Sequence, residues 1–158
     1  MKESKEPLIR LYSAVERLKE KLGVILFQLP SNLSFDRELF LPFCENLDHT
    51  QHHALEMRHP SWIDTNVFEI LKEHNIAFCL PDTAGRYPYH EVITADFLYI
   101  RLHGSKKLYA SEYSEEELQG WAKKIRSWNM PAHIYFDNDA KGFAIKNAKR
   151  LKEILSIS

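Results

Sequence analysis

Apolar residues recur along the chain in two patterns, one with the period of an α-helix and one continuous, as in a buried strand. The first helical face consists of apolar residues three or four positions apart: Leu8, Leu11, Val15, Leu18 and Leu22. Gly23 follows as a helix stop signal, and the apolar run Val24–Leu29 predicts a strand. The first part of the sequence therefore predicts a helix followed by a buried strand.

This alternation continues along the sequence. Further strands are predicted at four segments that are apolar throughout or on alternate residues: His53–Arg58, Ile76–Leu80, Phe97–Gly104 and Ala132–Phe136. Four more helices are predicted. The first is capped by Ser34, is kinked at Pro42 and holds Leu39, Phe40, Phe43 and Leu47. The others cover Asp64–His74, the segment from the Ser114–Glu117 capping box to Trp128, and a last segment that holds Ala144, Ala148, Leu151 and Leu155. Such alternation is typical of parallel strands joined by crossover helices. The predicted fold class is therefore α/β, with about five parallel strands in a single domain over residues 1–158.

Polar residues gather at one end of these predicted strands. The carboxyl ends carry, in order, Gln28, then Glu56 with Arg58 and His59, then Asp82, then Arg101 with His103, and finally Asp137 with Asn138 and Asp139. The opposite ends carry a less charged set: Gly23, His53, Asn75, Asp96 and Pro131. Because ligands of parallel α/β folds bind beyond the carboxyl ends of the strands, we expect the functional site there.

Two arginines at these ends indicate anion binding. A guanidinium binds a carboxylate or a phosphate through paired hydrogen bonds, so Arg58 and Arg101 are candidate donors. The alternative is that each arginine forms an internal ion pair with Glu56 or Asp82 that fixes the sheet. The predicted substrate-binding residues are Gln28, Arg58, Trp62, Arg101 and Asn138.

His103 is the predicted proton-transfer group, because imidazole titrates near neutral pH. Glu56 or Asp82 would serve as its partner, which makes Glu56, Asp82 and His103 the predicted catalytic residues. The alternative is a structural histidine with satisfied hydrogen bonds. No cofactor is predicted, and a divalent metal ion is kept as an alternative. Its ligands would come from successive strand ends: Glu56, Asp82, His103 and Asp137. The arginines at the same ends disfavour such a cation.

Aromatic residues follow several of the strands. Trp62 would form the floor of a pocket or cap the core between helix and sheet. A hydrogen-bonding rim suited to a sugar, a nucleoside or another polar ring would come from loop residues that ordinary packing explains equally well: Tyr87, Tyr89, His90, Tyr109 and Tyr113. His49, His52 and His53 precede a strand, so we interpret them as solvated loop residues rather than metal ligands.

Composition limits the possible partners. A net charge of -1 at pH 7 gives no general reason to expect nucleic acid or an anionic membrane as partner. No run approaches the ~20 apolar residues of a membrane span, so no membrane partner is expected. Cys44 and Cys79 lie among apolar residues without CxxC spacing, which indicates reduced thiols and a cytoplasmic location.

Four short motifs occur in a characteristic order. They are FQLP at 27–30, EMRHPSW at 56–62, YIRLHG at 99–104 and YFDND at 135–139. With these motifs the chain resembles the YecE-like family, domain of unknown function 72, over nearly its whole length. The resemblance implies a TIM-type (β/α) barrel from which about three further β/α units are absent here. We therefore expect a partial barrel, the C-terminal five-eighths. Asp137 departs from the asparagine that is more common at its position in the family.

These observations lead to one functional hypothesis with two alternatives. The chain is interpreted as a YecE-like protein of enzymatic ancestry that binds a small polar or anionic molecule at the carboxyl ends of its strands. The first alternative is a noncatalytic binding or assembly subunit, completed by a second copy or by a separately encoded N-terminal barrel fragment. The second is a divalent-metal-dependent hydrolase or isomerase. The hypothesis commits to binding and leaves catalysis open.

Overall fold

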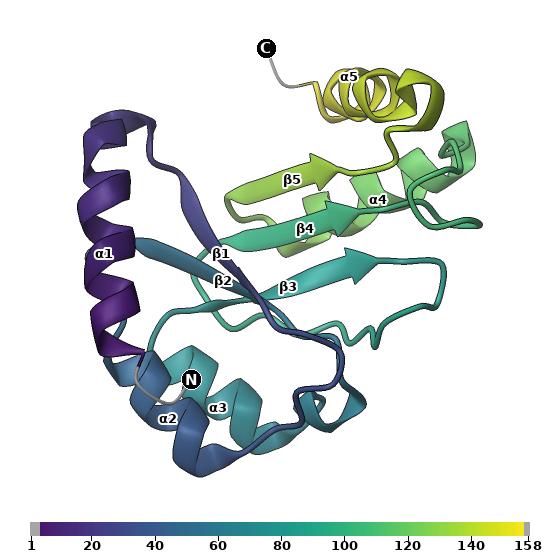
Figure 1. Ribbon diagram of the computed structural model, residues 1–158. Coiled ribbons are helices and arrows are strands. Elements are labelled where there is room, and N and C mark those ends of the chain that lie inside the picture. The colour runs from purple at the N-terminus through teal and green to yellow at the C-terminus, as the bar shows by residue number, and fades with distance from the viewer. Residues whose placement is uncertain (1–3, 157–158) are drawn as a thin grey trace. The chain divides into compact units, whose positions relative to one another are not determined.

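The computed structural model describes residues 4–156, and the contacts of its backbone divide the chain into two compact units. The first unit comprises the residues up to Phe78 together with Val92–Ala95. The second comprises Cys79–Glu91 together with the residues from Asp96 onward. Figure 1 labels the helices and strands of both units. A single domain over the whole chain stays a prediction.

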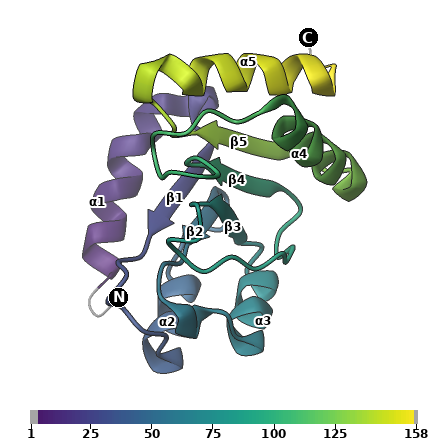
Figure 2. The same ribbon diagram turned by 90° about the vertical axis from the view of Figure 1, so that its right-hand side faces the viewer.

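In the first unit, β2 (His52–Glu56) pairs in parallel with β1 (Val24–Gln28) on one side and with the start of β3 (Ala77–Asp82) on the other. Its helices are α1 (Lys5–Val15) and η1 (Glu16–Lys21) before β1, α2 (Arg37–Glu45) between β1 and β2, and η2 (Pro60–Trp62) and α3 (Thr65–Glu73) between β2 and β3. The register places Gln28 of β1 opposite Glu56 of β2, and Leu55 opposite Phe78 of β3. Helices α2 and α3 pack side by side (Figure 2).

The second unit continues the pattern. It holds the rest of β3, then β4 (Leu98–Leu102), α4 (Glu115–Trp128), β5 (Ala132–Phe136), η3 (Ala140–Gly142) and α5 (Phe143–Leu155). Strand β4 pairs in parallel with both β3 and β5. The strand order is β1-β2-β3-β4-β5. The predicted α/β class with five parallel strands is confirmed. Helix α5 packs against α4 and β5.

The two faces of β4 and β5 differ in chemistry because strand side chains alternate. One face carries apolar side chains: Leu98, Ile100 and Leu102, with Ile134 and Phe136. The other face carries aromatic and charged side chains: Tyr99 and Arg101, continued by His103, with His133 and Tyr135, continued by Asp137. We call this second set the polar face. It carries three ionisable groups to the carboxyl ends of the strands.

Several predicted boundaries are wrong, including those of the strand predicted over Phe97–Gly104, which runs from Leu98 to Leu102. The first helix ends at Val15 rather than near Leu22, and a 3-10 turn follows in which Lys19 has φ +48°. Helix α2 is capped by Asp36, not by Ser34, because the Asp36 carboxylate accepts a hydrogen bond from the Glu38 N–H at 2.9 Å. Strand β2 ends at Glu56 instead of Arg58.

The interpretation of His53 as a solvated loop residue is also wrong. His53 belongs to β2 and is only 2% exposed. Its Nε2 lies 3.0 Å from the Tyr12 hydroxyl of α1, which itself accepts a hydrogen bond from the Asp48 N–H. Burial lowers the pKa of His53 from 6.5 to about 4, although the nearby Asp48 charge opposes the shift. This contact joins α1 to β2 through a neutral imidazole.

We predict that His53 makes the protein lose stability in mild acid. Between pH 6.5 and about 4 the unfolded chain binds a proton at His53 that the folded chain does not bind. The free energy of unfolding therefore falls as pH decreases through this window, by about 3 kcal/mol at most from this residue. Urea unfolding of the wild type and of His53→Phe at pH 7 and pH 4.5 measures it. The variant should lose less stability than the wild type between these two pH values; equal losses for the two proteins would contradict the prediction.

Candidate functional site

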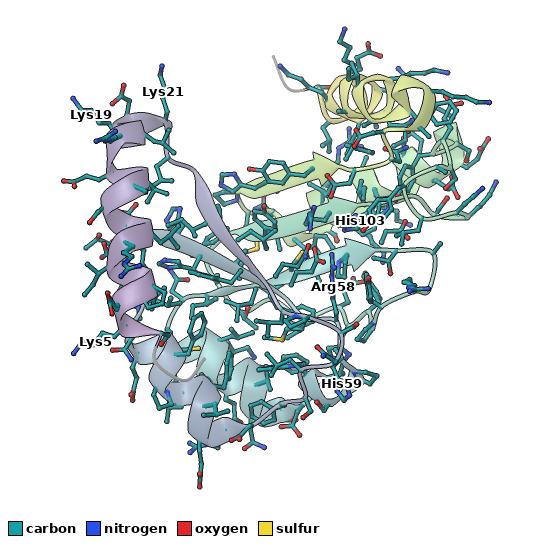
Figure 3. The ribbon with its side chains drawn as sticks, in the orientation of Figure 1. Lys5, Lys19, Lys21, Arg58, His59 and His103 are labelled. Carbon is teal, nitrogen blue, oxygen red and sulfur yellow. The ribbon has the colours of Figure 1, made fainter. Side chains whose placement is uncertain are left out.

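In the first unit, the ends of β1 and β2 bring three predicted site residues together. Arg58 Nε donates a hydrogen bond to Glu56 Oε1 at 2.7 Å, and Arg58 Nη2 donates to Gln28 Oε1 at 2.6 Å. The Glu56 side chain is fully buried and that of Arg58 is 14% exposed. Figure 3 labels Arg58 and His59 after β2 and His103 after β4. The predicted internal ion pair of Arg58 with Glu56 is present.

In the second unit, three charged or titratable side chains meet at the ends of β4 and β5. Arg101 Nη2 donates a hydrogen bond to Asp137 Oδ2, and His103 Nδ1 lies 3.2 Å from the same oxygen. We call Arg101, His103 and Asp137 the strand-end cluster. The side chain of His103 is fully buried, whereas those of Arg101 and Asp137 are 17% and 26% exposed. One carboxylate thus faces a guanidinium and an imidazole.

The arrangement of His103 and Asp137 is suited to proton transfer. Asp137 Oδ2 lies within ion-pair distance of His103 Nδ1, at 3.2 Å. This position favours the tautomer with its proton on Nδ1, which leaves a lone pair on Nε2. A carboxylate that orients an imidazole in this way is a recurring arrangement for proton transfer.

Asp82 at the end of β3 is held by a tyrosine. The Tyr113 hydroxyl donates to Asp82 Oδ2 at 3.0 Å and accepts from the Gly104 N–H at 3.0 Å. Burial is the main cause of a raised pKa of Tyr113, and the Asp82 charge adds to it. The Tyr113 hydroxyl therefore stays protonated and holds Asp82 beside the turn that follows His103.

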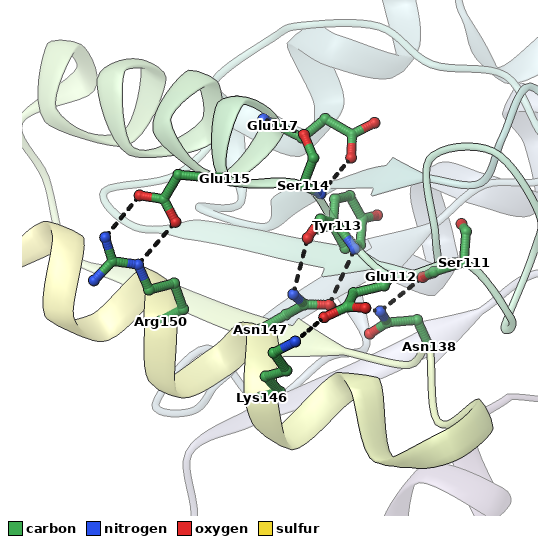
Figure 4. A network of polar contacts seen from close by, with 10 residues as sticks. All are labelled: Ser111, Glu112, Tyr113, Ser114, Glu115, Glu117, Asn138, Lys146, Asn147 and Arg150. Atoms are coloured by element: carbon green, nitrogen blue, oxygen red, sulfur yellow. Dashed lines mark hydrogen bonds and ion pairs between the residues drawn. The ribbon is translucent and has the colours of Figure 1, made fainter.

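A buried amide network fixes Tyr113 (Figure 4). Asn147 Oδ1 accepts from the Tyr113 N–H at 3.2 Å, and Asn147 Nδ2 donates to the Tyr113 carbonyl at 3.2 Å. Asn138 Nδ2 donates to Asn147 Oδ1 and to the Ser111 carbonyl, each at 2.9 Å. Asn138 is fully buried. These bonds give Asn138 a place in the framework, and its predicted substrate-binding role stays a prediction.

Trp62 lies in the core of the first unit. It is 1% exposed, and its indole N–H donates to the Leu33 carbonyl at 2.7 Å. Its ring packs against Phe35 and Phe40, at centroid distances of 5.2 and 5.0 Å. This placement is that of a core residue, as the packing alternative requires. A role for Trp62 in binding substrate stays a prediction.

No group of three or more His, Cys, Asp or Glu side chains among residues 4–156 is arranged to hold a metal ion. The metal alternative built on Glu56, Asp82, His103 and Asp137 therefore finds no support in the geometry. Within the same residues, no helix is both long enough and apolar enough to cross a membrane.

Sequence reasoning missed two residues that matter in the second unit. Asp137 was placed only in the alternative metal site, yet it is the common partner of Arg101 and His103. Its position one residue after β5, at the same parity as Tyr135, was the available signal. Asn147 lies inside α5, and no local pattern marks a buried amide that pairs with a distant loop.

Comparison with known proteins gives one family and several solved structures. Residues 1–158 match a family model described as "Protein of unknown function DUF72". A DUF72 family protein from Thermotoga maritima is 28% identical, with a TM-score of 0.85 over 96% of this chain and 65% of that chain. A DUF72 family protein from Enterococcus faecalis is 19% identical, with a TM-score of 0.84 over 98% of this chain and 66% of that one, a likeness that concerns the fold alone. This chain therefore spans slightly less than two thirds of both. No match is found among the curated proteins.

Proposed function

Because this chain belongs to the DUF72 family of proteins of unknown function, we propose its function from its own site: it binds a small polar or anionic molecule at the carboxyl ends of β4 and β5. The resemblance to the YecE-like family drawn from the sequence motifs is thereby confirmed. We further propose that this chain is part of a TIM-type barrel, and that a partner would supply the β/α units that the five strands do not provide.

One observation carries the proposal, namely the convergence of Arg101, His103 and Asp137. The planar guanidinium fork of Arg101 has the geometry that binds carboxylates and phosphates, and its Nη2 donates to Asp137 Oδ2. The cluster lies on the polar face, where Tyr135 is Arg101's partner in the strand register and is 42% exposed. A bound carboxylate or phosphate would be anchored by Arg101 beside an aromatic ring.

The enzymatic part of the proposal assigns proton transfer to His103. Asp137 would orient the imidazole and stabilise its protonated form, while Arg101 would neutralise charge that develops on the substrate. Asp82 at the end of β3, held by Tyr113, keeps its predicted role as an acid or base. Glu56 keeps its predicted catalytic role in the proposal, in addition to its ion pair with Arg58.

A structural role is the second candidate, and one observation favours it. Both arginines predicted to bind the anion have a carboxylate of the protein as ion-pair partner: Arg58 pairs with Glu56, and Arg101 pairs with Asp137. Ion pairs of this kind can fix strand ends without taking part in binding. The protein would then be a noncatalytic binding or assembly subunit.

Calorimetric titration with inorganic phosphate and with malonate separates the two candidates. We expect saturable binding of at least one of these anions, weakened about tenfold or more in Arg101→Ala. Arg150→Ala is the matched control, since Arg150 pairs with Glu115 and Glu153 on exposed helix surfaces and should bind as the wild type does.

Arg101→Lys keeps the charge but loses the planar fork, so it should fold and bind with intermediate affinity. Equal affinities for Arg101→Ala and Arg150→Ala would contradict the proposal. Loss of folding in both Arg101 variants, or no saturable binding of either anion by the wild type, would favour the structural role.

A further inference from the structure

A cavity of about 420 Å³ lies in the second unit, beside β3 and the beginning of α4. It is lined by the end of β3, the loop that follows, and the first turns of α4, and none of the strand-end cluster residues line it. The size falls within the range of small-molecule sites, about 300–1,000 Å³. We call it the aromatic pocket, after Tyr87, Tyr89 and Trp121 in its lining.

The aromatic walls of this pocket are held in place by Lys124. The Lys124 ammonium lies 5.5 Å from the ring centroids of both Tyr89 and Trp121. It also forms an ion pair with Glu91 at 2.7 Å, and the Tyr89 hydroxyl donates to the same Glu91 oxygen at 2.9 Å. These contacts tie the loop after β3 to α4. They hold the ring of Tyr89 in the loop and the ring of Trp121 on α4 in fixed positions.

Carboxylates supply the polar part of the lining. Asp82 is oriented by the Tyr113 hydroxyl, and Glu117 Oε2 accepts the Ser114 N–H at 2.7 Å in the capping box of α4 (Figure 4). Burial by itself raises the pKa of Glu117, but the hydrogen bond from Ser114 and the charge of Lys106 oppose burial, and the pKa lies below its usual value. An ionised carboxylate accepts hydrogen bonds from up to about four donors.

These features select a class of ligand. The two carboxylates disfavour an anion, and Lys124 already occupies the cation position over the two rings. An apolar ligand would cover both carboxylates without supplying any of the further hydrogen-bond donors that they can accept. A ring with several hydroxyl groups satisfies both parts, because its C–H faces pack on aromatic rings while its hydroxyls donate to carboxylates.

We propose that the aromatic pocket is a second binding site, distinct from the strand-end cluster, for a neutral polyhydroxylated ring such as a saccharide. Trp121 and Tyr89 stack on the ring, and Asp82 and Glu117 accept its hydroxyl hydrogens. The rim of aromatic residues predicted from the sequence thus divides, since Tyr87, Tyr89 and Tyr113 line this pocket whereas His90 and Tyr109 do not.

Calorimetric titration of the purified chain with maltose, D-glucose and D-ribose tests the proposal. We expect saturable binding of at least one sugar, weakened about tenfold or more in Trp121→Ala. The matched control is Trp128→Ala, a tryptophan on the same helix that does not line the pocket and should leave sugar affinity unchanged.

Tyr89→Ala gives a second variant at a position 43% exposed, where truncation should not disturb folding. It should also weaken sugar binding, by about tenfold or less. No saturable binding of any of the three sugars by the wild type would overturn the proposal. Unchanged affinity in Tyr89→Ala together with equal affinities in the two tryptophan variants would overturn it as well.

Discussion

Replacing Gly104 with alanine is expected to destabilise the protein by about 3 kcal/mol. Gly104 has φ +115°, a backbone conformation that residues with a Cβ rarely adopt. A Cβ there would lie 2.6 Å from the Lys107 carbonyl oxygen and 2.8 Å from Ser111 Oγ. The turn after His103 would have to open, which would also disturb the hydrogen bond from the Gly104 N–H to Tyr113.

Gly120→Ala is the matched control for this experiment. Gly120 lies inside α4, and beyond the adjacent backbone of the helix itself no atom lies within 4 Å of a Cβ added there, so alanine should stabilise the helix by up to about 1 kcal/mol. Urea unfolding of both variants measures the difference. Equal stability of Gly104→Ala and the wild type would show that the turn accepts a side chain.

Replacing Trp62 with alanine is expected to cost about 3–5 kcal/mol of stability, the largest effect predicted for the first unit. The substitution empties the space between Phe35 and Phe40 and leaves the Leu33 carbonyl without its indole donor. Trp62→Phe keeps a ring but not the N–H, so its cost should be smaller. Urea unfolding followed by circular dichroism compares the three proteins.

The same Trp62 variants separate a core role from a binding role. If Trp62 acts in the core, Trp62→Phe lowers stability and leaves the affinity for phosphate or malonate unchanged. A variant with wild-type stability that no longer binds either anion would instead support the predicted substrate-binding role. Half-buried Trp128→Ala serves as control, with a smaller expected loss of stability.

The order and type of the strands could be predicted because their signals are local. The Ser114–Glu117 capping box fixes the start of α4, and the apolar run Ala132–Phe136 forms β5 with the predicted bounds. The break after Val15 could not be predicted, since the apolar spacing continues through Leu18 while the backbone turns at Lys19. Apolar period alone does not reveal a change from an α-helix to a 3-10 turn.

The candidate site could be predicted in part, for a reason of topology. Carboxyl ends of parallel neighbours lie together, and this is why Gln28, Glu56 and Arg58 are in contact as expected. Which acid pairs with which base depends on side-chain reach across strands. Arg101 could therefore be assigned to the site, but its pairing with Asp137 could not be predicted.

Tyr113 belongs to the surroundings of both proposed sites. Its hydroxyl bonds Asp82 in the aromatic pocket and the Gly104 N–H in the turn after His103. Its backbone is clamped by Asn147, so a residue of α5 acts on both through one tyrosine. Long-range side-chain bonds of this kind carry no signal in a single sequence.

The most direct test of the strand-end cluster follows the Arg101 Nε–Hε resonance by nuclear magnetic resonance during titration with inorganic phosphate. Loss of one signal in Arg101→Lys assigns the resonance. We expect it to shift and saturate as phosphate is added, while the Arg150 resonance, assigned in the same way, stays in place. An Arg101 signal that does not move, or arginine signals that all shift together without saturating, would contradict an anion site at the ends of β4 and β5.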